Sequence, residues 1–266
     1  MSTYVCSDIH GCYEQFKEML DVISFSDEDT LYILGDAVDR GLDGIAILQD
    51  IIHRNNVELI IGNHELMMLK VLEVIKRLEQ RGLPYQCSRD ASSWVDYNGG
   101  HTTYSKFTAL TEEEQNKIVD YLKARPVIKV IEVNGSKFHL SHSFTIPNRE
   151  KDTYFIEDLT ASELDDVVWC SPFRYDRLFV SAEKYSETNL RYIVGHVPTY
   201  KLHNREEPKI IRQGNIIDID CGCVHGRTNS ALSCLRLDDG KAYYVRKVDM
   251  ISQADMVTLL ESSITE

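Results

Sequence analysis

The stretch Gly35-Asp36-Ala37-Val38-Asp39-Arg40-Gly41 follows directly on the apolar run Leu31–Leu34 and decides how the chain folds. A short apolar run of this kind is typical of a buried strand. Carboxylates at the end of a buried strand cost free energy unless something pairs with them. The stretch therefore predicts a strand whose end carries a charged site, in which Asp36 and Asp39 have partners of opposite charge.

On either side of this stretch, strand and helix patterns alternate along the chain. Apolar residues at positions 16, 19, 20 and 23 recur at helical spacing after the first predicted strand. The predicted strands are Thr3–Ser7, Leu31–Leu34 and Val57–Ile61, and the later predicted helices are Ile45–Asn55 and about Glu65–Gln80. This βαβαβα order favours a parallel sheet with helices packed on it.

The rest of the chain has weaker helical and stronger strand patterns. Gly82–Thr103 is interpreted as a connecting region, and Thr111 with Glu114 forms a capping box for a helix that ends before Pro126. Asn134-Gly135, the preferred pair of a type I′ turn, predicts a hairpin between the apolar runs that flank it. The predicted strands are Val127–Val133, Ser136–Ser141, Arg191–Gly195, Asn215–Asp220, Ser230–Leu237 and Ala242–Val248.

These patterns predict an α/β fold class: a single domain over residues 1–266, with two packed sheets flanked by helices, that begins as alternating α/β and ends largely as antiparallel β. A length of 266 residues is enough for one large core.

Composition excludes several classes of function. The net charge of −13 and the lack of a Lys/Arg cluster exclude a broad surface for duplex nucleic acid, so phosphate must be bound by local cations. No apolar run approaches the roughly 20 residues of a membrane span, and the first residues lack a signal-peptide pattern, so we expect a cytoplasmic protein. Seven irregularly spaced cysteines argue against a disulfide framework. The sequence does not indicate an oligomeric state.

Metal-competent and proton-competent side chains follow five of the predicted strands. Open α/β sheets bind ligands beyond the carboxyl ends of their strands, so we expect these side chains to meet. Carboxylate, amide and imidazole groups together suit Mn²⁺, Fe or Zn²⁺ better than Ca²⁺. Six candidate ligands exceed the needs of one catalytic ion, and two ions would use them all if Asp36 bridges. The side chains are Asp8 and His10; Asp36, Asp39 and Arg40; Asn63, His64 and Glu65; His142; and His196.

Each group alone also has an ordinary structural explanation. An aspartate can cap a helix or form an Asx turn, and single histidines are often structural. Those explanations would have to hold independently at all five strand ends, so a shared site is the better interpretation. His139 is not nominated, because it lies an odd number of residues from His142 and should face the other side of its strand. His101 and His225 receive no assigned role.

The clustered residues resemble a known family. Ser7-Asp8-Ile9-His10-Gly11, Gly35–Gly41 and Gly62-Asn63-His64-Glu65 are similar to the three signature motifs of the phosphoprotein phosphatases, which are binuclear metallophosphoesterases. His142 in Leu-Ser-His-Ser and His196 in Gly-His-Val-Pro resemble the later metal histidines of that family. The resemblance implies the calcineurin-like architecture, a central β-sandwich with helices outside. Ser7 departs from the usual glycine of the first motif.

The resemblance also implies roles for these residues. One divalent ion would be held by Asp8, His10 and Asp36, and the other by Asp36, Asn63, His142 and His196; Mn²⁺ is our first expectation for both, with Fe or Zn²⁺ as alternatives. A metal-bridging hydroxide would be the nucleophile. Arg40 and Arg174 would hold the phosphoryl oxygens, with Arg177 as the alternative to Arg174. His64 would be the general acid, oriented by Asp39.

The resemblance leaves the substrate open between two enzymes. Asp39 and Glu65 stand where symmetrical diadenosine tetraphosphate hydrolases often carry alanine and aspartate, which favours a protein serine/threonine phosphatase acting on phosphorylated proteins or peptides. The symmetrical diadenosine tetraphosphate hydrolase is the alternative. A third hypothesis, an inactive binding or scaffold protein, is disfavoured because all six candidate ligands and His64 are present.

Overall fold

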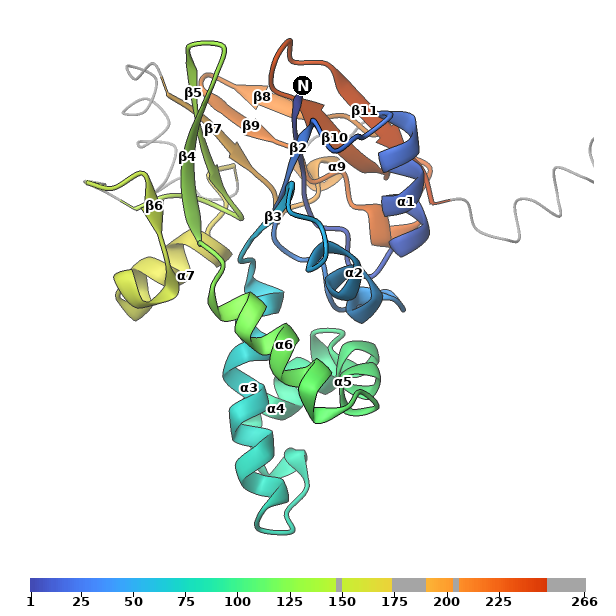
Figure 1. Ribbon diagram of the computed structural model, residues 1–266, viewed down its shortest axis with the longest axis vertical. Helices are drawn as coiled ribbons and strands as arrows, with labels where there is room; N and C mark the ends of the chain where they lie inside the picture. Colours follow the sequence, from blue (N-terminus) through green and yellow to red (C-terminus); the bar gives the residue numbers. More distant parts are fainter. Residues whose placement is uncertain (147–149, 174–189, 203–205, 248–266) are drawn as a thin grey trace, which may run out of the picture.

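The fold is described from a computed structural model, which describes residues 1–146, 150–173, 190–202 and 206–247 (Figure 1). The first sheet has the strand order β11-β10-β1-β2-β3, in which β1, β2 and β3 run parallel and β10 runs antiparallel to β1. It therefore contains the predicted parallel sheet, extended by two strands from the end of the chain. Its strands are β1 Thr3–Cys6, β2 Thr30–Leu34, β3 Val57–Ile60, β10 Leu232–Arg236 and β11 Ala242–Val245.

The second sheet has the order β6-β4-β5-β7-β9-β8 and is mixed. β5 pairs with β7 in parallel, and β7 pairs with β9 in parallel. The prediction of a largely antiparallel second half was wrong for these strands, because the chain returns to the same edge between them. The strands are β4 Ile128–Val133, β5 Ser136–Ser141, β6 Thr153–Tyr154, β7 Leu190–Val194, β8 Ile211–Gln213 and β9 Ile216–Asp218.

The two sheets pack face to face around an apolar layer. Val5, Leu34 and Ile60 of the first sheet share one buried cluster with Leu140 and Ile193 of the second. Alternate residues of the first sheet, such as Tyr4 and Cys6, face the other way and join the cluster that packs against the helices. This arrangement confirms the predicted α/β architecture of two packed sheets flanked by helices.

The helices gather on the outer side of the first sheet and below both sheets (Figure 1). Helix α1 contacts β10 and β11, whereas α3 runs away from the strand ends and packs with α4 and α6. The α-helices are α1 Tyr13–Val22, α2 Gly44–Ile51, α3 Asn63–Glu79, α4 Arg89–Ser92, α5 His101–Thr108, α6 Glu112–Lys123, α7 Ala161–Trp169 and α9 Thr199–Leu202. Among the described residues, no helix has the length and apolar character needed to cross a membrane.

The interpretation of Gly82–Thr103 as a plain connecting region was wrong. The segment holds a 3₁₀ turn (Tyr85–Cys87), α4, a π-helical turn (Ser93–Tyr97) and the start of α5. Each of these elements is too short to produce a clear apolar period. Other short turns are 3₁₀ helices at Ile156–Asp158 and Cys223–His225. The predicted capping box of α6 is confirmed, with the Glu114 amide donating to Thr111 Oγ1 at 3.3 Å.

The hairpin between β4 and β5 has the predicted turn. Asn134 and Gly135 have φ values of 51° and 75°, and both are therefore left-handed, as a type I′ turn requires. A Cβ atom added at Gly135 would have nothing within 4 Å, so only its backbone conformation opposes a side chain there.

Gly135→Ala should therefore lower the free energy of unfolding by about 1 kcal/mol, the cost of placing a non-glycine residue in the left-handed region. Gly135→Asn should lose less, because asparagine tolerates this conformation. Urea unfolding of both variants at a fixed Mn²⁺ concentration measures the difference. Equal losses in the two variants would show that something other than backbone conformation limits this turn.

Candidate metal centre

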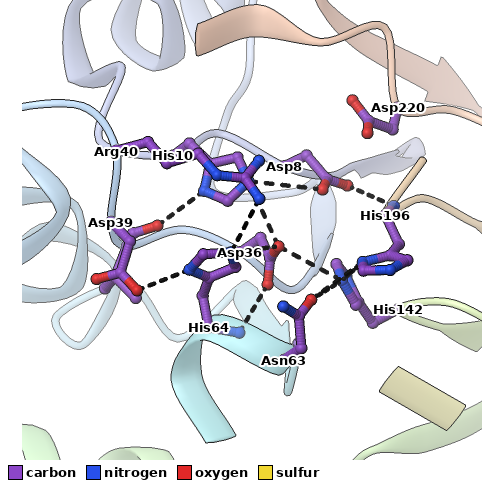
Figure 2. Close-up of polar contacts among 12 residues, drawn as sticks. Asp8, His10, Asp36, Asp39, Arg40, Asn63, His64, His142, His196 and Asp220 are labelled. Atoms are coloured by element: carbon purple, nitrogen blue, oxygen red, sulfur yellow. Dashed lines mark hydrogen bonds and ion pairs between the residues drawn. The ribbon is translucent and has the colours of Figure 1, made fainter. Parts of the chain in front are cut away.

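Five strand ends meet at one edge of the two sheets, as the sequence predicted (Figure 2). β1, β2 and β3 of the first sheet and β5 and β7 of the second each deliver side chains there. The structure brings together all six candidate metal ligands, and it places Asp39, Arg40 and His64 beside them. Arg174 and Arg177, the candidates for the second phosphate-binding arginine, lie outside the described residues. The six ligand candidates are Asp8, His10, Asp36, Asn63, His142 and His196.

Asp36 lies at the centre of the cluster. Its Oδ2 is 3.4 Å from His10 Nε2 and 3.5 Å from His142 Nε2. Its Oδ1 accepts a hydrogen bond from the backbone N–H of His64 at 3.1 Å. Burial raises the pKa of Asp36 well above its usual range, and the nearby carboxylates of Asp8 and Glu65 raise it further. A carboxylate in this environment needs a cation, and its position between two histidines fits the bridging role.

His142, Asn63 and His196 form the second part of the cluster. His142 Nδ1 donates to the Leu34 carbonyl at 2.7 Å, which fixes the proton on that nitrogen. Its Nε2 then carries a lone pair, and this lone pair faces Asn63 Oδ1 at 2.8 Å and His196 Nδ1 at 3.2 Å. Burial lowers the pKa of His142, which keeps the ring neutral. An imidazole lone pair facing a carbonyl oxygen is unfavourable without a cation between them, so these donor atoms fit a metal ion.

His10 has the same arrangement on the other side of Asp36. Its Nδ1 donates to the Val38 carbonyl at 2.9 Å, and its Nε2 turns toward Asp36. Burial lowers its pKa well below the usual value. A neutral imidazole oriented by a backbone carbonyl is the usual form of a histidine ligand. Asp8 joins the two parts of the cluster: its Oδ1 lies 3.9 Å from His10 Nε2, and its Oδ2 accepts the backbone N–H of His196 at 3.0 Å.

The backbone at these strand ends is strained. A left-handed conformation costs a non-glycine residue roughly 1–2 kcal/mol, and such residues concentrate at functional sites. Among the described residues, eight non-glycine residues have positive φ, and six of them belong to this cluster. The six are Asp8 (52°), His10 (46°), Asp36 (56°), Asp39 (69°), Arg40 (64°) and His196 (75°). The turns therefore hold side chains in place at the expense of local stability.

Glu65 is a structural residue of the site that the sequence analysis placed in the cluster but gave no role. Its carboxylate is fully buried and accepts backbone N–H groups from Asp36 and Ala37 at 2.8 Å, and from Gly62 at 3.0 Å. Gly35 lies so near this turn that an added Cβ would come within 2.5 Å of Gly62 Cα. Glu65 thus shapes the loop that carries Asp36 and ties it to the start of α3.

His64 points away from Asn63 and toward Asp39. Its Nδ1 donates to Asp39 Oδ2 at 2.7 Å, and the same oxygen accepts the Trp94 indole N–H at 2.7 Å. Burial lowers the pKa of His64, and the hydrogen bond to Asp39 opposes that shift. Trp94 is a supporting residue that the sequence analysis missed. No local pattern in the sequence links Trp94 to Asp39, which lies 55 residues earlier.

Arg40 is the exposed cation of the cluster. Its Nη1 donates toward His10 Nε2 at 2.7 Å and its Nη2 toward His64 Nε2 at 3.1 Å. The Arg40 backbone N–H donates to the Gly99 carbonyl at 2.8 Å, which fixes the loop that presents the guanidinium. The guanidinium therefore lies between a candidate metal ligand and the candidate general acid, where it can bind an oxyanion in a bidentate manner.

The remaining histidines lie outside this cluster. His139 is buried on the opposite face of β5, as expected from its spacing to His142, and its Nε2 lies 2.8 Å from Thr145 Oγ1. His101 is exposed at the start of α5. His225 lies in the 3₁₀ turn after β9, and its ring centroid is 5.8 Å from that of Tyr200. Asp220, in the same region, reaches the rim of the cluster, and burial raises its pKa well above the usual value (Figure 2).

Several curated proteins resemble part of this chain. The symmetrical bis(5'-nucleosyl)-tetraphosphatase of Erwinia tasmaniensis is 30% identical over 150 residues, which is 55% of this chain and 46% of that protein. The enzyme of the same name from Baumannia cicadellinicola is 29% identical over 173 residues, 63% of this chain and 50% of that protein. The chain spans half the length or less of these relatives.

Two solved structures share the fold over most of the chain. A candidate diadenosine tetraphosphatase superposes with a TM-score of 0.58 at 20% identity, covering 91% of this chain and 92% of that one. A protein serine/threonine phosphatase from Saccharomyces cerevisiae superposes with a TM-score of 0.59 at 14% identity, covering 94% and 81%. At such low identity these likenesses describe the architecture alone.

The family model of the calcineurin-like phosphoesterases matches residues 1–226, which include every strand end that meets at the cluster. With that match, the two-sheet fold and the cluster of carboxylate, amide and imidazole groups, this chain belongs to the calcineurin-like phosphoesterase family.

Proposed function

We propose that this protein is a metal-dependent hydrolase that cleaves dinucleoside tetraphosphates symmetrically, giving two nucleoside diphosphates from one substrate and one water. The observation that carries the proposal is the likeness to proteins named symmetrical bis(5'-nucleosyl)-tetraphosphatase, at 28–30% identity over about 150 residues or more. This was the alternative of the sequence analysis, and it now replaces the protein phosphatase as the first hypothesis.

The contacts of Asp39 and Glu65 explain the change. These two residues favoured the phosphatase at the sequence level, but both side chains are fully buried. Glu65 binds backbone N–H groups, and Asp39 binds His64 and Trp94. Neither side chain can contact the alcohol or nucleotide part of a substrate. Their identity therefore reports how the site is supported, and it does not discriminate between the two substrates.

The residues of the cluster would hold two divalent ions, as the family implies. Asp8, His10 and Asp36 would hold one ion, and Asp36, Asn63, His142 and His196 the other. When bound, the ions supply Lewis acidity and positive charge for attack by water at phosphorus. The mixture of oxygen and nitrogen donors suits Mn²⁺, Fe and Zn²⁺, with Mn²⁺ as the first to test.

The other side chains would act on the substrate directly. Arg40 would bind phosphoryl oxygens, because a guanidinium matches their spacing and remains charged. His64 would donate a proton from Nε2 to the leaving oxygen, while Asp39 holds the ring through Nδ1. In symmetrical cleavage the leaving oxygen belongs to a nucleoside diphosphate, which needs protonation less than the alkoxide of a phosphoserine does. The contribution of His64 should therefore depend on the leaving group.

Product analysis tests the proposed substrate. Mn²⁺-loaded protein is incubated in parallel with diadenosine tetraphosphate and with a phosphoserine peptide, and the products are separated by chromatography. We expect ADP as the single nucleotide product, with little phosphate released from the peptide. Phosphate from the peptide with intact dinucleotide would restore the protein phosphatase, and a mixture of ATP and AMP would exclude symmetrical cleavage.

Substitution of His64 tests the acid. His64→Asn should lower kcat by about 10²–10⁴-fold on substrates with poor leaving groups, the usual contribution of general acid catalysis. The loss should be smaller on diadenosine tetraphosphate. Asp39→Asn should lower kcat less than His64→Asn does, again more on poor leaving groups than on diadenosine tetraphosphate. The substitution misorients the His64 ring without removing it. Metal content is measured in both variants, and an unchanged kcat on an alkyl phosphate would remove His64 from this role.

Metal binding is testable without any substrate. An ion at 100 times its Kd stabilises the folded state by about 2.7 kcal/mol, which for a chain of this size raises Tm by about 5–10 °C. Mn²⁺ should raise the Tm of the wild type by this amount, and Asp36→Asn should abolish most of the shift. His139→Gln is the matched control, a buried histidine on the opposite face of β5, and it should keep the shift. A full shift in Asp36→Asn would contradict the proposed ligand set.

A further inference from the structure

Trp169, the last residue of α7, borders the metal cluster beside His196. Its ring centroid lies 5.8 Å from that of His196, with the two rings perpendicular. His196 is on the side of the cluster opposite Arg40 (Figure 2). The other tryptophan of the chain, Trp94, is completely buried, whereas 40% of the surface of Trp169 is exposed. A large aromatic surface therefore faces solvent next to a candidate metal ligand.

The position of Trp169 is fixed by the strand end that carries His142. The Val167 carbonyl, near the end of α7, accepts backbone N–H groups from Ser143 at 2.9 Å and Phe144 at 3.1 Å. Val167 and Val168 are completely buried, which anchors the last turn of α7 in the core. The helix therefore ends at a defined place, and its last residue projects beside the site on a rigid support.

Trp169 has no role in the proposed chemistry, but it fits the rest of the substrate. A dinucleoside polyphosphate carries a purine at each end of its phosphate chain, and base–aromatic stacking is a main source of affinity for exposed bases. The chain has a net charge of −13, which repels a polyphosphate at long range. Uncharged contacts to the base are therefore a favourable way to bind such a substrate.

We infer that Trp169 is a stacking platform for one nucleobase of the substrate, with the adjoining phosphates directed past His196 toward Arg40. This inference rests on the proposed function for its substrate class. Trp169 is a specificity-determining residue in this account, because it contacts the base and does not contact the reacting phosphorus. An enzyme with this platform distinguishes a nucleotide from a polyphosphate that lacks a base.

Binding of ADP and pyrophosphate tests the inference independently of turnover, because the two ligands share a diphosphate and differ by adenosine. Calorimetry with Mn²⁺-loaded wild type should show that ADP binds about tenfold or more tightly than pyrophosphate, the scale of one stacked base. In Trp169→Ala this preference should disappear, while the affinity for pyrophosphate stays the same. Trp169→Phe should restore most of the preference.

Intrinsic fluorescence gives a second readout, since Trp94 is buried and serves as an internal reference. ADP should strongly quench the fluorescence of the wild type and only weakly that of Trp169→Phe. Pyrophosphate has no base to stack and should not quench either protein in this way. An unchanged preference for ADP in Trp169→Ala would overturn the inference. Parallel loss of pyrophosphate affinity and of bound metal in that variant would also overturn it, by showing that Trp169 only supports His196.

The test separates this inference from the proposed function. If the wild type fails to cleave diadenosine tetraphosphate but still prefers ADP through Trp169, the platform stands and the assigned substrate falls. If the dinucleotide is cleaved and Trp169→Ala has the wild-type KM for it, the substrate stands and the platform falls. Dependence of phosphopeptide binding on Trp169, with none for ADP, would assign the ring to a peptide and overturn the inference.

Discussion

The structure depends on one electrostatic constraint, which is the need to neutralise Asp36 where five strands end. The carboxylate is buried beside two others, and burial lowers the pKa of the surrounding histidines, whose Nδ1 protons are fixed by backbone carbonyls. Neither the apolar core nor the acidic surface can supply the missing positive charge. The ligands from both sheets therefore act as one unit with the ions they bind, and Arg40 is the protein's own cation at the opening.

Much of this arrangement could be predicted from the sequence because the first third of the chain follows local rules. The strands and helices up to α3 have clear apolar periods, and the groups at their ends are short motifs with recognisable donor chemistry. The turn at Asn134-Gly135 and the capping box at Thr111 are similarly local. For all of these, the nearest neighbours in sequence are also the physical cause of the structure.

The features that sequence reasoning missed depend on partners far along the chain. The parallel pairing of β5, β7 and β9 is set by the path of the intervening segments, which a strand pattern does not reveal. Glu65 binds N–H groups that precede it by 27–29 residues, and Trp94 binds a carboxylate 55 residues away. The weight given to Asp39 and Glu65 in choosing between substrates has the same origin, because their buried partners lie elsewhere in the sequence and could not be seen in it.

The hydrogen bond between the His196 amide and Asp8 joins residues that are 188 positions apart. During synthesis, the first three motifs leave the ribosome long before His142 and His196 do. A nascent chain can thus fold its parallel sheet and carry four of the six candidate ligands without being able to complete the site. The contact between the residues that follow β1 and β7 can therefore form only late in synthesis, and the candidate metal centre is completed by the last part of the chain to join it.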